Sequence, residues 1–227
     1  MSSAVPRPRL RPNLSRVISA IELLLGVFLV LGHNVFRVVP NEVPLLFVFG
    51  LLSVWLRDGS WSAIGFKRPA SWTRTVQIAV AAAVLRIVLG EFVIDPLTAR
   101  FWPPAALPAG AEAITGNLGA AILALLFVWT FAAFGEEIAY RGYLLTRAAD
   151  LGKRSPRAYW AGLVLVSVLF GFGHYYKGPS GIVDSGVAGL ILGAAYLLSG
   201  RNLWVCILAH GFIDTFVIAV VFFGWQS

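Results

Sequence analysis

The chain contains few charged residues and a single cysteine, and both shortages limit what it can be. Only 13% of its 227 residues are charged, while 58% are hydrophobic, and the mean hydropathy is +0.79. Soluble domains carry about 25% charged residues, so this chain has too few of them to cover a surface that faces water. The composition therefore excludes an ordinary soluble globular enzyme. Because Cys206 is the single cysteine of the chain, an intramolecular disulfide and a metal site built from several cysteines are both excluded.

Seven apolar segments run along the chain, and most match the roughly 20 residues that a helix needs to cross a bilayer. We therefore predict an all-α, polytopic transmembrane bundle of about seven membrane helices. We expect a basic cytoplasmic tail at residues 1–16 and a single transmembrane domain at 17–227, in which residues 118–225 hold the functional motifs. The predicted membrane segments are 17–39, 44–56, 75–94, 118–151, 158–176, 182–199 and 203–225.

The formal charge of +7 would suggest a nucleic-acid partner in a soluble chain. In a membrane protein, however, basic residues collect in cytoplasmic loops and orient the helices. The predicted segments place 13 of the 18 basic residues on one side, three on the other and two inside helices, so we expect a cytoplasmic N-terminus and no nucleic-acid partner. The thirteen are Arg7, Arg9, Arg11, Arg16, Arg57, Lys67, Arg68, Arg74, Arg147, Lys153, Arg154, Arg157 and Arg201.

Ionisable residues inside a membrane are expensive, so they are the first candidates for function. Three predicted helices of the second half of the chain carry them. Glu137 and Arg141 stand four residues apart and share a helix face, as do His210 and Asp214. Glu136 lies about 100° around the helix from Glu137, so it is not needed for the pair with Arg141 and is free to take another role. At a rise of about 1.5 Å per residue, these groups and His174 fall within one bilayer core, which predicts a single buried polar pocket.

The residue types in this pocket suit the activation of water. A buried glutamate can serve as a general base, and a neighbouring histidine can hold the same water and relay protons. A second histidine can stabilise an oxyanion. The motifs contain no obvious serine or cysteine nucleophile, so direct attack by water is the simpler mechanism.

The order Glu-Glu-x-x-x-Arg, Phe-x-x-x-His and His-x-x-x-Asp on three successive membrane helices resembles the CPBP family. These are the CAAX-protease and bacteriocin-processing (Abi) intramembrane proteases. The resemblance implies an intramembrane endopeptidase of glutamate type in a prokaryotic cytoplasmic membrane, acting on a membrane-associated protein or peptide among membrane lipids. It implies that Glu136 is the general base, that His174 shares its water and that His210 stabilises the oxyanion.

The resemblance also implies supporting roles for the Glu137–Arg141 pair. Asp214 matches a position that is often Asn in the family, so it either orients His210 or is itself protonated. Two alternatives stay open. A divalent metal such as zinc, held by Glu136, His174 and His210, is the alternative to a mechanism without a cofactor. A membrane scaffold or proton-coupled transporter that does not cleave peptides is the alternative function, because buried Glu and His residues also serve proton relays.

Overall fold

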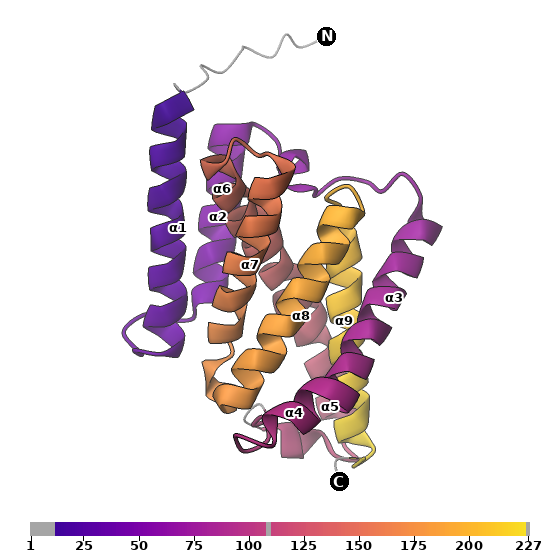
Figure 1. Cartoon of the computed structure of the whole chain (residues 1–227). Coiled ribbons are helices and arrows are strands. Elements are labelled where there is room, and N and C mark those ends of the chain that lie inside the picture. Colours follow the sequence, from indigo (N-terminus) through magenta and orange to yellow (C-terminus); the bar gives the residue numbers. More distant parts are fainter. Residues whose placement is uncertain (1–11, 108–109, 226–227) are drawn as a thin grey trace.

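The computed structural model describes residues 12–107 and 110–225, and within these ranges it contains helices and no strand. The helices pack side by side as a bundle (Figure 1). Five of them are long and apolar enough to cross a membrane, and the shorter α2 and α7 have 17 residues each. The predicted all-α polytopic bundle is therefore confirmed.

Polar side chains cap the starts of several helices. Asn41, Ser71, Asn117, Ser155 and Asn202 each accept a hydrogen bond from a backbone N–H in the first turn of the helix that follows. The helices are α1 (Pro12–Asn34), α2 (Glu42–Asp58), α3 (Trp72–Leu89), α4 (Asp95–Thr98), α5 (Leu118–Phe127), α6 (Leu145–Leu151), α7 (Pro156–Phe172), α8 (Gly178–Leu198) and α9 (Leu203–Phe222). Short 3-10 turns are η1 (Trp61–Ile64), η3 (Ala111–Ile114) and η6 (Tyr175–Lys177).

The helices begin and end at other residues than the predicted membrane segments. The first helix begins at Pro12, so the last residues of the predicted tail are helical, while residues 1–11 of that tail lie outside the described residues. The third helix continues through the π-helical segment η2 (Gly90–Ile94) and α4 to Thr98, four residues beyond the predicted segment 75–94. The sixth begins at Gly178, because Pro179 fits the first turn of a helix and does not break it.

The fourth predicted segment is one continuous helix, but much of it is not α-helical. Between α5 and α6 lie two π-helical segments, η4 (Val128–Glu136) and η5 (Ile138–Leu144). Wide π-helical turns in α-helices are rare and occur frequently at functional sites. The departure from α-helical geometry therefore surrounds the Glu136–Glu137 pair.

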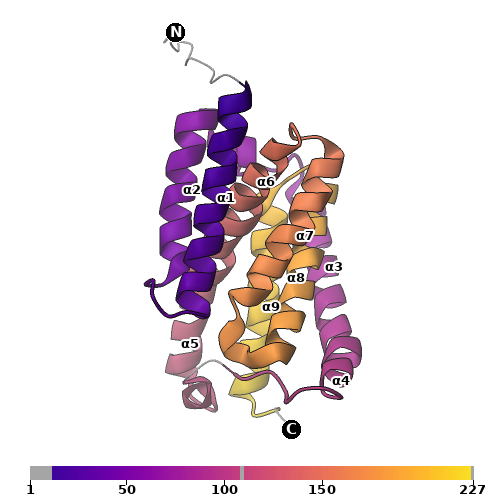
Figure 2. The same ribbon diagram turned by 60° about the vertical axis from the view of Figure 1, so that its left-hand side comes forward.

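The small residues of α8 allow close packing against α7, as Figure 2 shows. A Cβ atom added at Gly189 would lie 3.1 Å from the Cα atom of Ser167 on α7, closer than ordinary van der Waals contact. Ser185 and Gly189 are both buried. This close approach brings α7 and α8 together beside the helix that carries Glu137.

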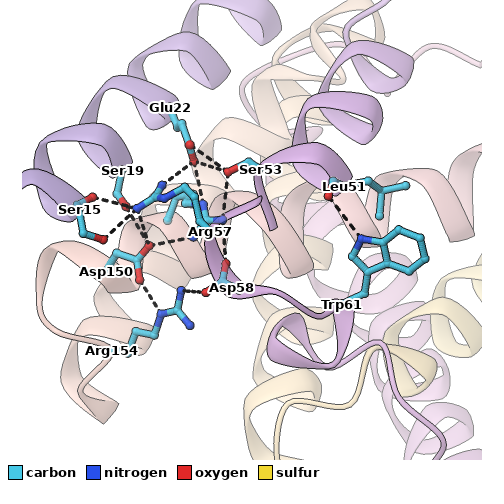
Figure 3. A network of polar contacts seen from close by, with 11 residues as sticks. Ser15, Ser19, Glu22, Leu51, Ser53, Arg57, Asp58, Trp61, Asp150 and Arg154 are labelled. Carbon is cyan, nitrogen blue, oxygen red and sulfur yellow. Dashed lines mark hydrogen bonds and ion pairs between the residues drawn. The ribbon is translucent and has the colours of Figure 1, made fainter. Parts of the chain in front are cut away.

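A group of charged side chains lies at the end of the bundle where α1 begins and α2 and α6 end (Figure 3). Arg147 is fully buried and contacts Glu22 at 2.7 Å, Asp58 at 2.9 Å and Asp150 at 3.0 Å. Arg57 pairs with Glu22 at 3.0 Å, and Arg154 pairs with Asp58 at 2.6 Å. We call these residues the ionic cluster, which consists of Glu22, Arg57, Asp58, Arg147, Asp150 and Arg154.

Candidate functional site

The centre of the candidate site is the carboxylate of Glu137, which is fully buried. Its Oε1 atom lies 2.8 Å from Nη1 of Arg141 and 2.8 Å from Nδ1 of His210 on α9. Arg141 is 2% exposed and also donates to the carbonyl oxygen of Gly189 on α8 at 3.4 Å. Glu137 and Arg141 therefore join their own helix to α9 and α8. The predicted pairing of these two residues is confirmed.

The ring of Phe170, near the end of α7, packs between the polar side chains of the site and contacts them. The guanidinium carbon of Arg141 lies 4.3 Å from the ring centroid, a cation–π distance. The rings of His174 and His210 lie 4.8 Å and 6.2 Å from it, and the ring of Tyr140 packs against its edge at 5.0 Å. Phe170 thus holds both histidines and the arginine in fixed positions around one apolar surface.

His174 follows the last turn of α7, and its Nδ1 atom lies 3.0 Å from the carbonyl oxygen of Phe170. A carbonyl oxygen only accepts, so Nδ1 carries the proton of this hydrogen bond. In the neutral ring, Nε2 is then left as an acceptor. The side chain of His174 is partly exposed, so this nitrogen is available to a water molecule.

His210 lies between two carboxylates. Its Nδ1 atom faces Glu137, and its Nε2 atom lies 3.4 Å from Oδ2 of Asp214, one turn further along α9. Carboxylates accept hydrogen bonds, so this arrangement suits an imidazole ring that donates from both nitrogens. The contact with Asp214 is the longer one, so a substrate oxygen can compete with Asp214 for the Nε2 proton.

Glu136 is the carboxylate of the site with the fewest contacts. Its Oε2 atom is buried and has no hydrogen-bond partner among the described residues. It lies within electrostatic range of His210 and Asp214, and its side chain is partly exposed. A buried carboxylate oxygen without a donor is costly and is rarely retained for stability alone. Glu136 is therefore the group of this site that is most suited to bind a water molecule or a substrate proton.

The structure brings four of the six predicted site residues into direct polar contact, namely Glu137, Arg141, His210 and Asp214. No hydrogen bond joins Glu136 or His174 to these four in the described part of the chain. A water molecule can connect polar groups that stand too far apart for a direct bond. Sequence analysis missed Tyr140 as a contact of Phe170, because a tyrosine in an apolar segment is typical of the core.

The residues of the alternative metal site do not assemble as ligands. In residues 12–107 and 110–225, no group of three or more His, Cys, Asp or Glu side chains is arranged to hold a metal ion. His210 directs both of its ring nitrogens at carboxylates. In this arrangement, Glu136, His174 and His210 therefore do not fit a metal centre.

A bundle of apolar helices with Glu137, Arg141 and His210 buried among them defines an integral membrane protein with a polar site between its helices. The model of the Rce1-like family, described as type II CAAX prenyl endopeptidase Rce1-like, matches residues 118–216. This region holds all six site residues, and it is similar to the Rce1-like family, whose name describes a CAAX prenyl endopeptidase. The resemblance seen in the sequence is thus confirmed. No curated protein and no solved structure matches the chain.

Proposed function

We propose that the chain is an intramembrane endopeptidase in which Glu136 activates the water that attacks the peptide bond. The observation that carries this proposal is that Oε2 of Glu136 is buried without a hydrogen-bond partner in the described chain, and that neither oxygen of Glu136 is bound by Arg141 or His210, which both contact Oε1 of Glu137. One glutamate supports the helices and the other remains available for proton transfer. The Rce1-like family supports a peptide-bond hydrolase.

The proposed reaction uses one water molecule and returns Glu136 to its initial state. The water oxygen attacks the carbonyl carbon of the peptide while Glu136 takes one proton from the water. The carbonyl electrons move to the oxygen and give a tetrahedral intermediate with an oxyanion. Glu136 then gives its proton to the amide nitrogen, the C–N bond breaks, and a new carboxyl terminus and a new amino terminus leave.

Two histidines assist this reaction in the proposal. Nε2 of His174 accepts a hydrogen bond from the attacking water, because Nδ1 is bound to the carbonyl of Phe170. Nε2–H of His210 turns from Asp214 towards the oxyanion, a donor placed where negative charge develops. Glu137 and Arg141 hold His210 in place, and Asp214 keeps it protonated between catalytic cycles.

We propose that the substrate is a membrane-associated protein or peptide that reaches the site among membrane lipids, without a nucleic-acid partner. The family name points to prenylated carboxy-terminal peptides as the first substrates to test. The excess of basic residues on one side of the predicted helices supports a cytoplasmic N-terminus. The prokaryotic cytoplasmic membrane is proposed from the family resemblance alone.

The test compares peptide amino termini in membranes that contain the wild type, Glu136→Gln or Glu91→Gln. Glu91 is an exposed glutamate of η2, so its variant is a matched control for the loss of a carboxylate. We expect new amino termini with the wild type and Glu91→Gln and none with Glu136→Gln. Equal products from all three folded proteins, or no products at all with prenylated peptides added, would favour the scaffold or transporter alternative.

A further inference from the structure

A buried carboxylate outside the six site residues lies at the first position of α2. Glu42 is 4% exposed although it stands near the polar end of a helix, where water is normally within reach. Burying a charged carboxylate costs several kcal/mol unless hydrogen bonds and opposite charges compensate. The mechanism above assigns no role to Glu42, so its burial requires another explanation.

The last turn of α1 supplies the partners of Glu42. Nδ2 of Asn34 donates to Oε1 of Glu42 at 2.8 Å, and it also lies 3.1 Å from the carbonyl oxygen of Val30. Nε2 of His33 lies 3.6 Å from Oε2 of Glu42. Nδ1 of His33 lies 3.1 Å from the carbonyl oxygen of Val39 in the connecting loop. The turn between α1 and α2 is therefore organised around this carboxylate.

The other side of Glu42 faces the end of α7. A Cβ atom placed on Gly173 would lie 3.7 Å from Oε1 of Glu42, 2.9 Å from Oη of Tyr140 and 3.2 Å from the carbonyl oxygen of Phe170. Three oxygen atoms thus lie close to Gly173, the residue directly before His174. The carbonyl of Phe170 is the same group that accepts the hydrogen bond from His174.

Tyr140 links this convergence to the site. It is 1% exposed, follows Glu136 by four residues and packs against the Phe170 ring. Its hydroxyl oxygen lies beside Gly173, the same glycine that Oε1 of Glu42 approaches. The end of α7 is therefore enclosed by Tyr140 from one helix and by Glu42 from another.

We propose that Glu42 is a positioning residue for His174, so that the hairpin of α1 and α2 completes the active site. Asn34 and His33 fix the carboxylate, and the carboxylate packs on Gly173 and fixes the last turn of α7. The His174 ring is oriented by the Phe170 carbonyl in that same turn. This inference rests on the proposed function only for its effect on turnover, because the position of His174 can be observed without a substrate.

The first test uses histidine resonances. The chain has three histidines, so NMR of the full-length protein with labelled histidine in detergent micelles gives few signals, and His174→Gln identifies one of them. We expect Glu42→Ala and Glu42→Gln to move the His174 resonance, whereas Glu91→Ala at an exposed position of η2 leaves it in place. An unmoved His174 resonance in folded Glu42→Gln, which keeps the shape of the side chain, overturns the proposal.

The second test separates turnover from binding. In a peptide-cleavage assay, Glu42→Ala should lower kcat about tenfold and change KM less than about twofold, because small misplacements of a reacting group reduce the rate without removing substrate contacts. Glu42→Gln should retain more of the rate than Glu42→Ala. Wild-type kcat in Glu42→Ala contradicts the inference. If the wild type itself cleaves no peptide, the proposed function is contradicted, and the resonance test alone decides the role of Glu42.

Discussion

The ionic cluster and the candidate site are both groups of charged side chains buried among apolar helices, but they differ in the balance of their charges. The ionic cluster combines three arginines with three carboxylates, and each member has an ion-pair partner (Figure 3). The candidate site combines three carboxylates with one arginine and two histidines. In the site, Oε2 of Glu136 and Oε2 of Glu137 have no hydrogen-bond partner among the described residues, and Glu136 has no ion-pair partner there either.

This difference separates a structural role from a chemical one. Buried ions cost several kcal/mol each, and balanced, well-formed pairs recover that cost. The ionic cluster ties α1, α2 and α6 together and leaves no carboxylate available for reaction. The site retains an excess of carboxylates, and proton transfer during hydrolysis requires such a group. We therefore expect variants of the cluster to change stability and variants of the site to change activity.

The largest expected effect comes from exchanging one glutamate in each group for glutamine. Glu136→Gln should lower kcat about 1,000-fold or more, because an amide cannot act as a general base, and should leave the unfolding temperature unchanged. Glu22→Gln should keep wild-type kcat and lower the unfolding temperature, because Glu22 pairs with Arg57 and Arg147. Peptide cleavage and thermal unfolding in micelles measure both. A stable, inactive Glu22→Gln would remove the distinction between the two groups.

A second prediction concerns the arginine at the centre of the ionic cluster. Arg147→Ala removes the fully buried partner of three largely buried carboxylates and should lower the free energy of unfolding by about 3–5 kcal/mol. Arg157→Ala, at an exposed position of α7, should change it by less than about 0.5 kcal/mol. Denaturant titration in micelles measures the difference. The folded fraction of Arg147→Ala should keep wild-type kcat, and equal stability of the two variants would contradict the structural role.

The third prediction concerns how Asp214 acts on His210. If the carboxylate holds the Nε2 proton, Asp214→Asn should lower kcat about ten- to a hundredfold, since a hydrogen bond to a charged group contributes about 1.5–3 kcal/mol. Steady-state cleavage by wild type and Asp214→Asn measures this, with the unfolding temperature as the control for folding. Activity at or above the wild-type level would instead indicate that residue 214 acts as a hydrogen-bond donor to the oxyanion.

The sequence predicted the fold class because the apolar segments are long and the motifs repeat at helical spacing. The four-residue intervals from Glu137 to Arg141 and from His210 to Asp214 predicted contacts that the structure contains. The catalytic roles of these residues and the division into tail and domain remain predictions. The family match confirms the resemblance that the three motifs carry.

Contacts between helices far apart in the sequence were not predictable in this way. Arg57, Arg147 and Arg154 were counted as basic residues of cytoplasmic loops, but all three are paired with carboxylates in the ionic cluster. Helical spacing within one segment contains no information on its neighbours, so neither this cluster nor the approach of Glu42 to Gly173 could be inferred. The π-helical turns were missed because an apolar run has the same composition in either kind of helix.

The smallest expected effect lies at the edge of the ionic cluster, where Arg154 pairs with Asp58 and Asp150. Burial alone would lower the pKa of Arg154, but the hydrogen bonds and charges of the two carboxylates have the larger effect and raise this pKa above its usual range. Arg154 is therefore charged throughout the accessible pH range. Its side chain is 32% exposed, so solvent and salt weaken these pairs. Arg154→Gln should lower the free energy of unfolding by about 1 kcal/mol or less, and the loss should shrink at 1 M salt compared with about 0.1 M. Denaturant titrations at both salt concentrations measure it. If Arg154→Gln lowered the free energy of unfolding as much as Arg147→Ala does, and salt did not change this loss, the ionic cluster would act as one unit. The contribution of each arginine would then not depend on how exposed its side chain is.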